Sequence, residues 1–221
     1  MHGVIGHQRA FTYKVTVPPA NLAVSLDTFK LHIKATSLEN DTLLTLYLQA
    51  AITYCEQFTR RDLITRTYET FRDVFPGFRG YEPPFVNAAI TTGNIGFEIR
   101  RSPLQSIEKI EYLVSAVLTL VDDTIYYNTV ETDYSEVLTL EGNSWPTDSD
   151  NRLQAIKITF KTGFGDDETD IPDQFQEAIM AHAAQMWANR GDCDISSSAD
   201  VKAAVPPASR IIYMQNRIEN L

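Results

Sequence analysis

The stretch "NDTLLTLYLQAAITYCEQFTRRDLITRTYETFRDVF" (40–75) changes its hydrophobic period partway along. In its first part, apolar residues recur every three or four positions, as on one face of an α-helix. These residues are Leu44, Tyr47, Leu48, Ala51, Tyr54, Cys55 and Phe58. From Ile64 onward, β-branched and aromatic residues alternate with polar ones, as in a strand. The stretch therefore predicts a long helix, capped by Asn40 or Asp41, and then a strand over 64–75.

The same two periods organise the rest of the chain. "SLDTFKLHIKAT" (25–36) predicts a helix with Ser25 as its N-cap, and helical spacing returns at 170–191 and again at 208–221. Between the early and late helices, a long loop is expected over 76–94. Further candidate strands follow at 95–101, 106–114, 124–130, 136–141 and 154–164. This middle part predicts an antiparallel β region of about five or six strands.

The expected fold class is α+β, in which the N- and C-terminal helices form one helical bundle with an inserted antiparallel β region. Apolar helix stripes need partners, and each set of helices can supply them for the other. The predicted parts are an N-terminal arm (1–24), the first half of the helical part (25–62), the antiparallel β region (63–165), the second half of the helical part (166–191), and a loop with a C-terminal helix for partner docking (192–221).

Composition narrows the class of protein. The chain has 221 residues, of which 43% are hydrophobic, so it can build a substantial core. We expect no membrane segment, because no apolar run approaches the ~20 residues that a spanning helix needs. The net charge of −10 argues against a protein that binds nucleic acid through its phosphate groups, because such binding needs basic patches. An acidic surface repels phosphate, so nucleic acid could still move past it without binding. Cys55 and Cys193 are expected to be free thiols, with no zinc site.

Five carboxylates crowd the eight positions from Asp166 to Asp173, in "FGDDETDIPDQF" (164–175). We interpret the cluster as a helix start, with Asp170 as the cap and Asp173 in the first turn, beside the positive end of the helix dipole. Asp166, Asp167 and Glu168 are then expected to form a solvated loop. The alternative, a calcium loop, requires a D-x-[DN]-x-[DN]-G order that this stretch lacks.

The sequence offers no positive case for catalysis. His2 and His7 lie in the N-terminal arm, and His32 and His182 each lie on a predicted helix without a nearby cysteine or second histidine. No P-loop, G-x-S-x-G or H-E-x-x-H motif occurs. We therefore expect no enzyme, no catalytic residue, no cofactor and no metal.

Several stretches, taken in order, resemble the head–tail connector (adaptor) family of tailed bacteriophages and of phage-derived gene-transfer particles. Each stretch is a cap, a turn or a core stripe, so the resemblance depends on their order and spacing. They are "VTVPPANLAVSLDTFKLHIKA" (15–35), "DTLLTLYLQAAITYCEQFTRRDLITRTYE" (41–69), "IRRSPLQSIEKIEYL" (99–113), "NSWP" (143–146) and "AIKITFKTGFGDDETDIPDQFQEAIMAHAAQMWANR" (155–190).

The resemblance implies a structural protein of the virion neck, assembled in the host cytoplasm. The family forms a ring of about twelve copies below the portal, which extends the DNA channel and joins the capsid to the tail. The implied partners are other copies of the chain, the portal protein, a stopper or tail-completion protein, and double-stranded DNA that passes through without specific binding. The helical part would form the ring wall, and the C-terminal segment would reach toward the portal.

Two segments are candidates for these contacts. The last helix is too apolar for a free tail and suits docking in a groove of the portal, although it could instead pack on its own bundle. The candidate docking residues are Ile211, Ile212, Tyr213, Met214, Gln215, Ile218 and Leu221. The N-terminal arm alternates like a strand, so it could pair with its own fold or with another subunit. Its candidate interface residues are Phe11, Tyr13, Val15 and Val17.

Two other functions remain open from the sequence. One is a small cytoplasmic enzyme, such as a hydrolase or transferase, with a cleft between the bundle and the sheet. The other is a transient tail-assembly factor, which would be absent from finished particles.

Overall fold

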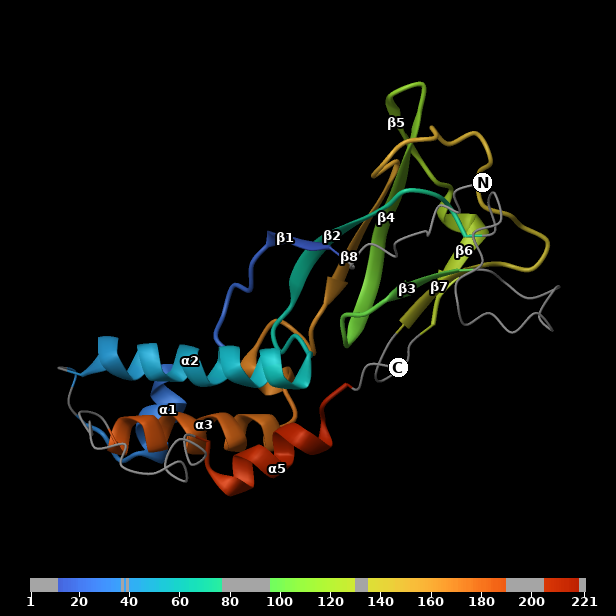
Figure 1. Ribbon diagram of the computed structural model, residues 1–221. Coiled ribbons are helices and arrows are strands. Elements are labelled where there is room, and N and C mark those ends of the chain that lie inside the picture. The colour runs from blue at the N-terminus through green and yellow to red at the C-terminus, as the bar shows by residue number, and fades with distance from the viewer. Residues whose placement is uncertain are drawn as a thin grey trace, which may run out of the picture. The chain divides into compact units, whose positions relative to one another are not determined.

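The computed structural model of the chain describes residues 12–36, 38, 40–76, 96–129, 135–189 and 205–218. Its elements divide into a β unit and a helical unit (Figure 1). The β unit draws its described residues from 1–18, 66–100 and 104–162, and the helical unit from 19–65, 101–103 and 163–221. Phe11, Leu221 and most of the loops expected over 76–94 and 192–207 lie outside the described residues.

The larger sheet of the β unit is antiparallel throughout, in the order β1-β2-β8-β4-β5. Its strands are β1 (Tyr13–Val17), β2 (Arg66–Arg72), β8 (Ile156–Thr162), β4 (Leu104–Val114) and β5 (Val117–Leu120). The central strands carry the large core side chains, and Tyr68 stacks on Phe160 with ring centroids 5.7 Å apart. The two edges of this sheet are therefore β1 and β5, which are both short.

A smaller antiparallel sheet in the same unit has the order β3-β7-β6. Its strands are β3 (Gly96–Ile99), β7 (Ser135–Thr139) and β6 (Tyr126–Asn128), and a 3-10 turn, η1 (Asp123–Ile125), leads into β6. Gly96 is required in β3, because a Cβ there would lie 2.3 Å from the carbonyl oxygen of Val137. Side chains of both sheets share one core, in which Trp145 stacks on Phe75 at 5.4 Å.

The helical unit contains α1 (Leu26–His32), α2 (Asp41–Thr59), α3 (Asp173–Ala188) and α5 (Pro207–Gln215). These helices share one apolar core, to which α2 contributes Leu44, Leu48, Ala51 and Cys55. α2 lies along α3, and α5 packs on both (Figure 1). Segment 101–103 also belongs to this unit, because the backbone N–H of Asp62 donates to the carbonyl of Ser102 at 2.9 Å.

The helix ends follow local chemistry in most places. Ser25 caps α1 as expected, and its side chain accepts a hydrogen bond from the N–H of Thr28. α2 begins after Asn40, but the Asn40 side chain makes no capping hydrogen bond. The helix stops where Arg60 adopts a left-handed conformation, with φ of 62°. Asn40 is thus the N-cap by position only, and packing of the apolar face stabilises α2.

The expected cap of α3 was wrong. The helix starts at Asp173 with Pro172 as its N-cap, whereas Asp170 ends a separate 3-10 turn, η2 (Glu168–Asp170). The Asp170 carboxylate accepts from the backbone N–H of Asp167 at 3.1 Å, as one half of a capping box on η2. Asp173 does lie in the first turn of α3.

The mixture of helices and antiparallel strands predicted from the sequence is confirmed. The described residues of the β region expected over 63–165 hold seven strands, β2 to β8, where five or six were expected, because β5 was missed; β1 lies in the N-terminal arm. β5 follows β4 through a tight turn at Ser115 and Ala116, whose φ angles are 51° and 65°. Hairpin turns of this kind usually contain Asn or Gly, so Ser-Ala gave no turn signal.

Candidate functional site

The described residues include one buried cysteine and several exposed apolar side chains. Among all the described residues, no group of three His, Cys, Asp or Glu side chains could hold a metal ion. No helix in the described part of the chain is long and apolar enough to cross a membrane. Cys55 is buried in the helical core, and burial raises the pKa of its thiol well above the usual range, so it is inert. Cys193 lies outside the described residues.

The acidic loop is a structural clamp within the helical unit. The Glu168 carboxylate accepts hydrogen bonds from the hydroxyls of Ser25 and Thr28, each at 3.2 Å, and from the backbone N–H of Ser25. Asn21 donates to the carbonyl of Asp166 and to the carboxylate of Asp167. The expectation of a solvated loop was therefore wrong for Glu168, because its carboxylate binds the N-terminus of α1, where the helix dipole favours negative charge.

The N-terminal arm pairs with its own fold over the described residues. β1 runs antiparallel to β2, and the Tyr13 ring packs edge-on against Phe160 at 5.9 Å. Val15 and Val17 are exposed, with 43% and 56% of their surface accessible. Of the candidate arm residues, Tyr13 thus anchors the strand, while the two valines remain available on a sheet edge.

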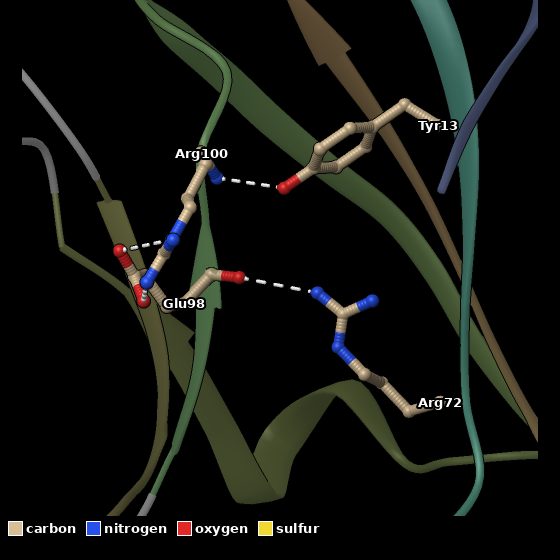
Figure 2. Close-up of polar contacts among 4 residues, drawn as sticks. All are labelled: Tyr13, Arg72, Glu98 and Arg100. Carbon is tan, nitrogen blue, oxygen red and sulfur yellow. Dashed lines mark hydrogen bonds and ion pairs between the residues drawn. The ribbon is translucent and has the colours of Figure 1, made fainter. Parts of the chain in front are cut away.

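Polar contacts around Tyr13 join the two sheets of the β unit (Figure 2). The Tyr13 hydroxyl accepts from the backbone N–H of Arg100 at 2.9 Å. The Arg100 guanidinium binds both carboxylate oxygens of Glu98, at 2.8 and 2.9 Å. Arg72 on β2 donates to the carbonyl of Glu98 on β3 at 3.4 Å. The start of β1 is thereby fixed to the end of β3.

The β4–β5 hairpin exposes a group of three large apolar side chains. Val117, Leu118 and Leu120 have 64%, 52% and 63% of their surface accessible. Because successive strand residues point to opposite faces, both faces of β5 are apolar. The Asp150 carboxylate fixes the turn by accepting from the N–H groups of Ser115 and Ala116, each at 2.8 Å. Sequence reasoning missed this surface, although the run "VLTL" (117–120) is a usable strand signal.

The last helix divides the candidate docking residues between its two faces. Tyr213 is fully buried and packs on Tyr54, Phe58 and His182, so it cannot contact a partner in this arrangement. Ile212 and Ile218 are half-buried, and the N–H of Ile218 donates to the carbonyl of Thr59. The exposed members are Ile211, Met214 and Gln215. The helix therefore packs on its own unit through one face and leaves the other face free for a partner.

Comparison with known proteins gives the fold a context. No family model and no curated protein sequence matches the chain. A chain from the neck of an empty gene transfer agent (GTA) particle, solved with sixfold symmetry, is 17% identical with a TM-score of 0.70, over 95% of this chain and 97% of that one. A chain from the native GTA virion is 19% identical, with a TM-score of 0.68 over 95% and 97%.

A third solved structure, of the neck of the native GTA particle with twelvefold symmetry, contains a chain that is 19% identical with a TM-score of 0.67. This match covers 96% of the present chain and 97% of the other. All three matches thus span nearly the full length of both chains, so they concern the whole arrangement of elements. The protein has the fold of chains found in gene transfer agent particles and their necks, in agreement with the resemblance seen in its sequence.

Proposed function

We propose that the protein is a head–tail connector (adaptor) subunit, which forms a ring below the portal and joins the capsid to the tail. The observation that carries this proposal is the likeness in fold, over 95% of the chain, to a chain in the neck of a GTA particle. The function is geometric, so the protein catalyses no reaction and needs no cofactor. It is assembled in the host cytoplasm and acts in the neck of the virion.

A ring is supported by the sixfold and twelvefold symmetry of the similar necks. We propose twelve copies, as in the twelvefold neck. In each copy, the helices before and after the β region form one bundle, which supplies the wall of the ring. This view is supported by the helical unit, which draws on residues from both sides of the β unit in sequence.

The surfaces proposed to contact partners are those on which apolar side chains are exposed. We assign portal docking to the free face of α5, with Ile211, Met214 and Gln215. We assign the contact with the stopper or tail-completion protein to the tip of the β4–β5 hairpin, whose apolar side chains Val117, Leu118 and Leu120 are exposed on both faces. Both surfaces have the apolar centre that protein interfaces require.

The negative charge of the chain suits a channel through which DNA moves without binding to the wall. At a net charge of −10, a ring of copies presents an acidic field that repels phosphate. Specific or tight DNA binding would instead need basic patches that neutralise the backbone. Double-stranded DNA is therefore expected to pass through the ring without specific binding.

The test is to mix the purified full chain with the portal protein of the same particle and to image the complex by electron microscopy. The expected result is a closed ring of this chain on one face of the portal. A portal that stays bare contradicts the proposal. Finished particles should also contain the chain, and its absence from them would identify a transient assembly factor instead.

A further inference from the structure

The outward face of α2 is uncharged along nearly the whole helix. The exposed residues on this face, here called the outer α2 face, are Thr42, Leu43, Leu46, Gln49, Ala50, Thr53 and Gln57. At about 100° per residue they fall in one stripe, opposite the stripe that carries Leu44, Leu48, Ala51 and Cys55 into the core. The face is about 22 Å long, from the ~1.5 Å rise per residue of an α-helix.

The only two charged residues of α2 are engaged within the subunit. Asp41 binds the ammonium group of Lys30 at 2.8 Å, and the Glu56 carboxylate accepts from the backbone N–H of Leu63 at 3.1 Å. A helix face that stays in water usually carries Lys, Glu or Arg, which keep it soluble. Charged residues make up 22% of the chain, yet none lies on the outer α2 face, so this face is not built to remain in water.

We propose that the outer α2 face is the contact through which one copy of this chain packs against the next copy in the ring. This inference rests on the proposed function and adds the surface that closes the ring. Two copies that each carry a net charge of −10 repel one another across charged surfaces, so an uncharged face is where they approach at the lowest cost.

The chemistry of the face also fits a second copy better than other occupants. It has no cationic side chain for nucleic acid, and its glutamine and threonine residues do not suit the interior of a membrane. The small side chain of Ala50 lies between larger ones and allows a neighbouring element to approach closely. In a ring the contact is heterologous, so the outer α2 face meets a different surface of the neighbour rather than another α2.

The first experiment places a charge on this face without touching the core. Ala50→Glu changes an exposed alanine of the outer α2 face, and Ala188→Glu makes the same change at an exposed alanine on α3 as the matched control. Both variants should stay folded, although Ala188→Glu should unfold at a slightly lower temperature than the wild type, because it places a negative charge at the C-terminal end of α3. On the portal, Ala50→Glu should reduce the yield of closed rings at least tenfold, counted by native mass spectrometry, whereas Ala188→Glu should form rings as the wild type does.

The second experiment identifies the neighbour. A photoreactive benzoylphenylalanine in place of Leu46, in the full chain assembled on the portal, should crosslink to a second copy of this chain, outside its α2. A crosslink to the portal, or to α2 of another copy alone, overturns the inference.

The two experiments separate this inference from the proposed function. If the wild-type chain forms rings and Ala50→Glu forms them equally well, the inference alone is wrong. If the wild-type chain forms no ring, the proposed function fails and the inference fails with it.

Discussion

A Cβ atom at Gly165 would lie 2.2 Å from a carboxylate oxygen of Asp170. The glycine therefore allows the acidic loop to fold tightly over that carboxylate, which accepts from the N–H of Asp167. The same loop holds Glu168 against Ser25 and Thr28, which lie 143 and 140 positions earlier in the chain. The acidic cluster that could be mistaken for a cation site therefore joins the start of α1 to the loop that precedes α3.

Replacing Glu168 with alanine should destabilise the helical unit. The change leaves the hydroxyls and N–H at the start of α1 without their acceptor, at a cost of roughly 1–2 kcal/mol in the free energy of unfolding. Urea unfolding followed by circular dichroism measures the loss. Asp166→Ala is the matched control, because Asp166 is exposed and contributes its backbone carbonyl rather than its carboxylate to the contact with Asn21. Equal losses of unfolding free energy in both variants would contradict a stabilising role for the Glu168 carboxylate at the start of α1.

Tyr213 is a buried side chain whose polar group, within the described part of the chain, is not hydrogen-bonded. Its ring fills the core between α2, α3 and α5, but among the described residues its buried hydroxyl has no hydrogen-bond partner. Burial also raises the pKa of this phenol far above its usual value.

Tyr213→Phe should therefore be neutral or stabilising by up to about 1 kcal/mol, because it removes an unsatisfied polar group and keeps the ring. Tyr213→Ala should cost about 3–5 kcal/mol through the cavity it leaves. Thermal unfolding of the two variants beside the wild type measures both effects. A large loss in the phenylalanine variant would show that the hydroxyl has a partner in solution.

At the scale of the element, the long amphipathic helices could be predicted from the sequence. α2 is a 19-residue helix whose buried positions repeat at the helical period, so a single stretch contains the whole signal. The strands β2, β3, β4 and β8 were likewise visible from alternation and β-branched residues. The sequence also predicted that the last helix is apolar, but not which of its faces is buried.

Other elements could not be predicted, because their cause lies far away in the chain. Glu168 is a loop residue by local rules, and only the folded contact with α1 gives it a role. The turn at Ser115 and Ala116 is held by Asp150, some 35 positions later, instead of by Asn or Gly in the turn itself. The β5 surface was missed for that reason, and with it the exposed apolar hairpin tip.

Ion pairs between neighbouring side chains of β4 and β8 make the stability of the β unit depend on pH. The Glu111 carboxylate lies 2.6 Å from the ammonium of Lys157 and 3.2 Å from that of Lys109. Partial burial raises the pKa of Glu111, but the two ammonium groups outweigh it and hold that pKa below its usual 4.5. Because the folded-state pKa is the lower one, ionised Glu111 stabilises the fold above about pH 4.5, and this stabilisation is lost as the pH falls through the folded-state pKa.

Glu111→Gln should consequently be less stable than the wild type at pH 7, by roughly 0.5–1 kcal/mol, as measured by denaturant unfolding. At pH 3, which lies below the usual pKa of 4.5, the two proteins should be closer in stability, because the unfolded chain then binds a proton at Glu111 and the gain from ionisation is being lost. A gap that is as wide at pH 3 as at pH 7 would mean that packing, rather than charge, accounts for the difference.

The two proposed partner surfaces can be tested separately by charge substitutions at exposed apolar positions. Ile211→Glu on α5 should weaken binding to the portal at least tenfold and leave the fold intact, because the side chain is 55% exposed. Leu118→Glu at the hairpin tip should keep portal binding and lose the stopper or tail-completion protein. Each variant is the control for the other in pull-down assays. Deleting 208–221 is a poorer test, since it removes Tyr213 from the core.

At the scale of the whole molecule, the net charge of −10 opposes the assembly of many copies. Raising the salt concentration from about 0.05 to 0.5 M shortens the screening length severalfold and weakens this repulsion. Apolar contacts are not weakened by the same change, so ring formation on the portal should become more complete at higher salt. Mass photometry across a salt series measures the ring fraction. A ring that falls apart as salt rises would show that ion pairs hold the copies together.

The helical unit is built from segments on both sides of the β unit in sequence, and this ordering governs how each copy matures on the ribosome. α1 and α2 emerge first, yet the core that they share with α3 and α5 cannot close until the chain has been made as far as Tyr213. Such late closure keeps a nascent chain from adopting its final shape and leaves apolar surface for chaperones to shield. A partly made chain therefore cannot yet present the complete helical unit.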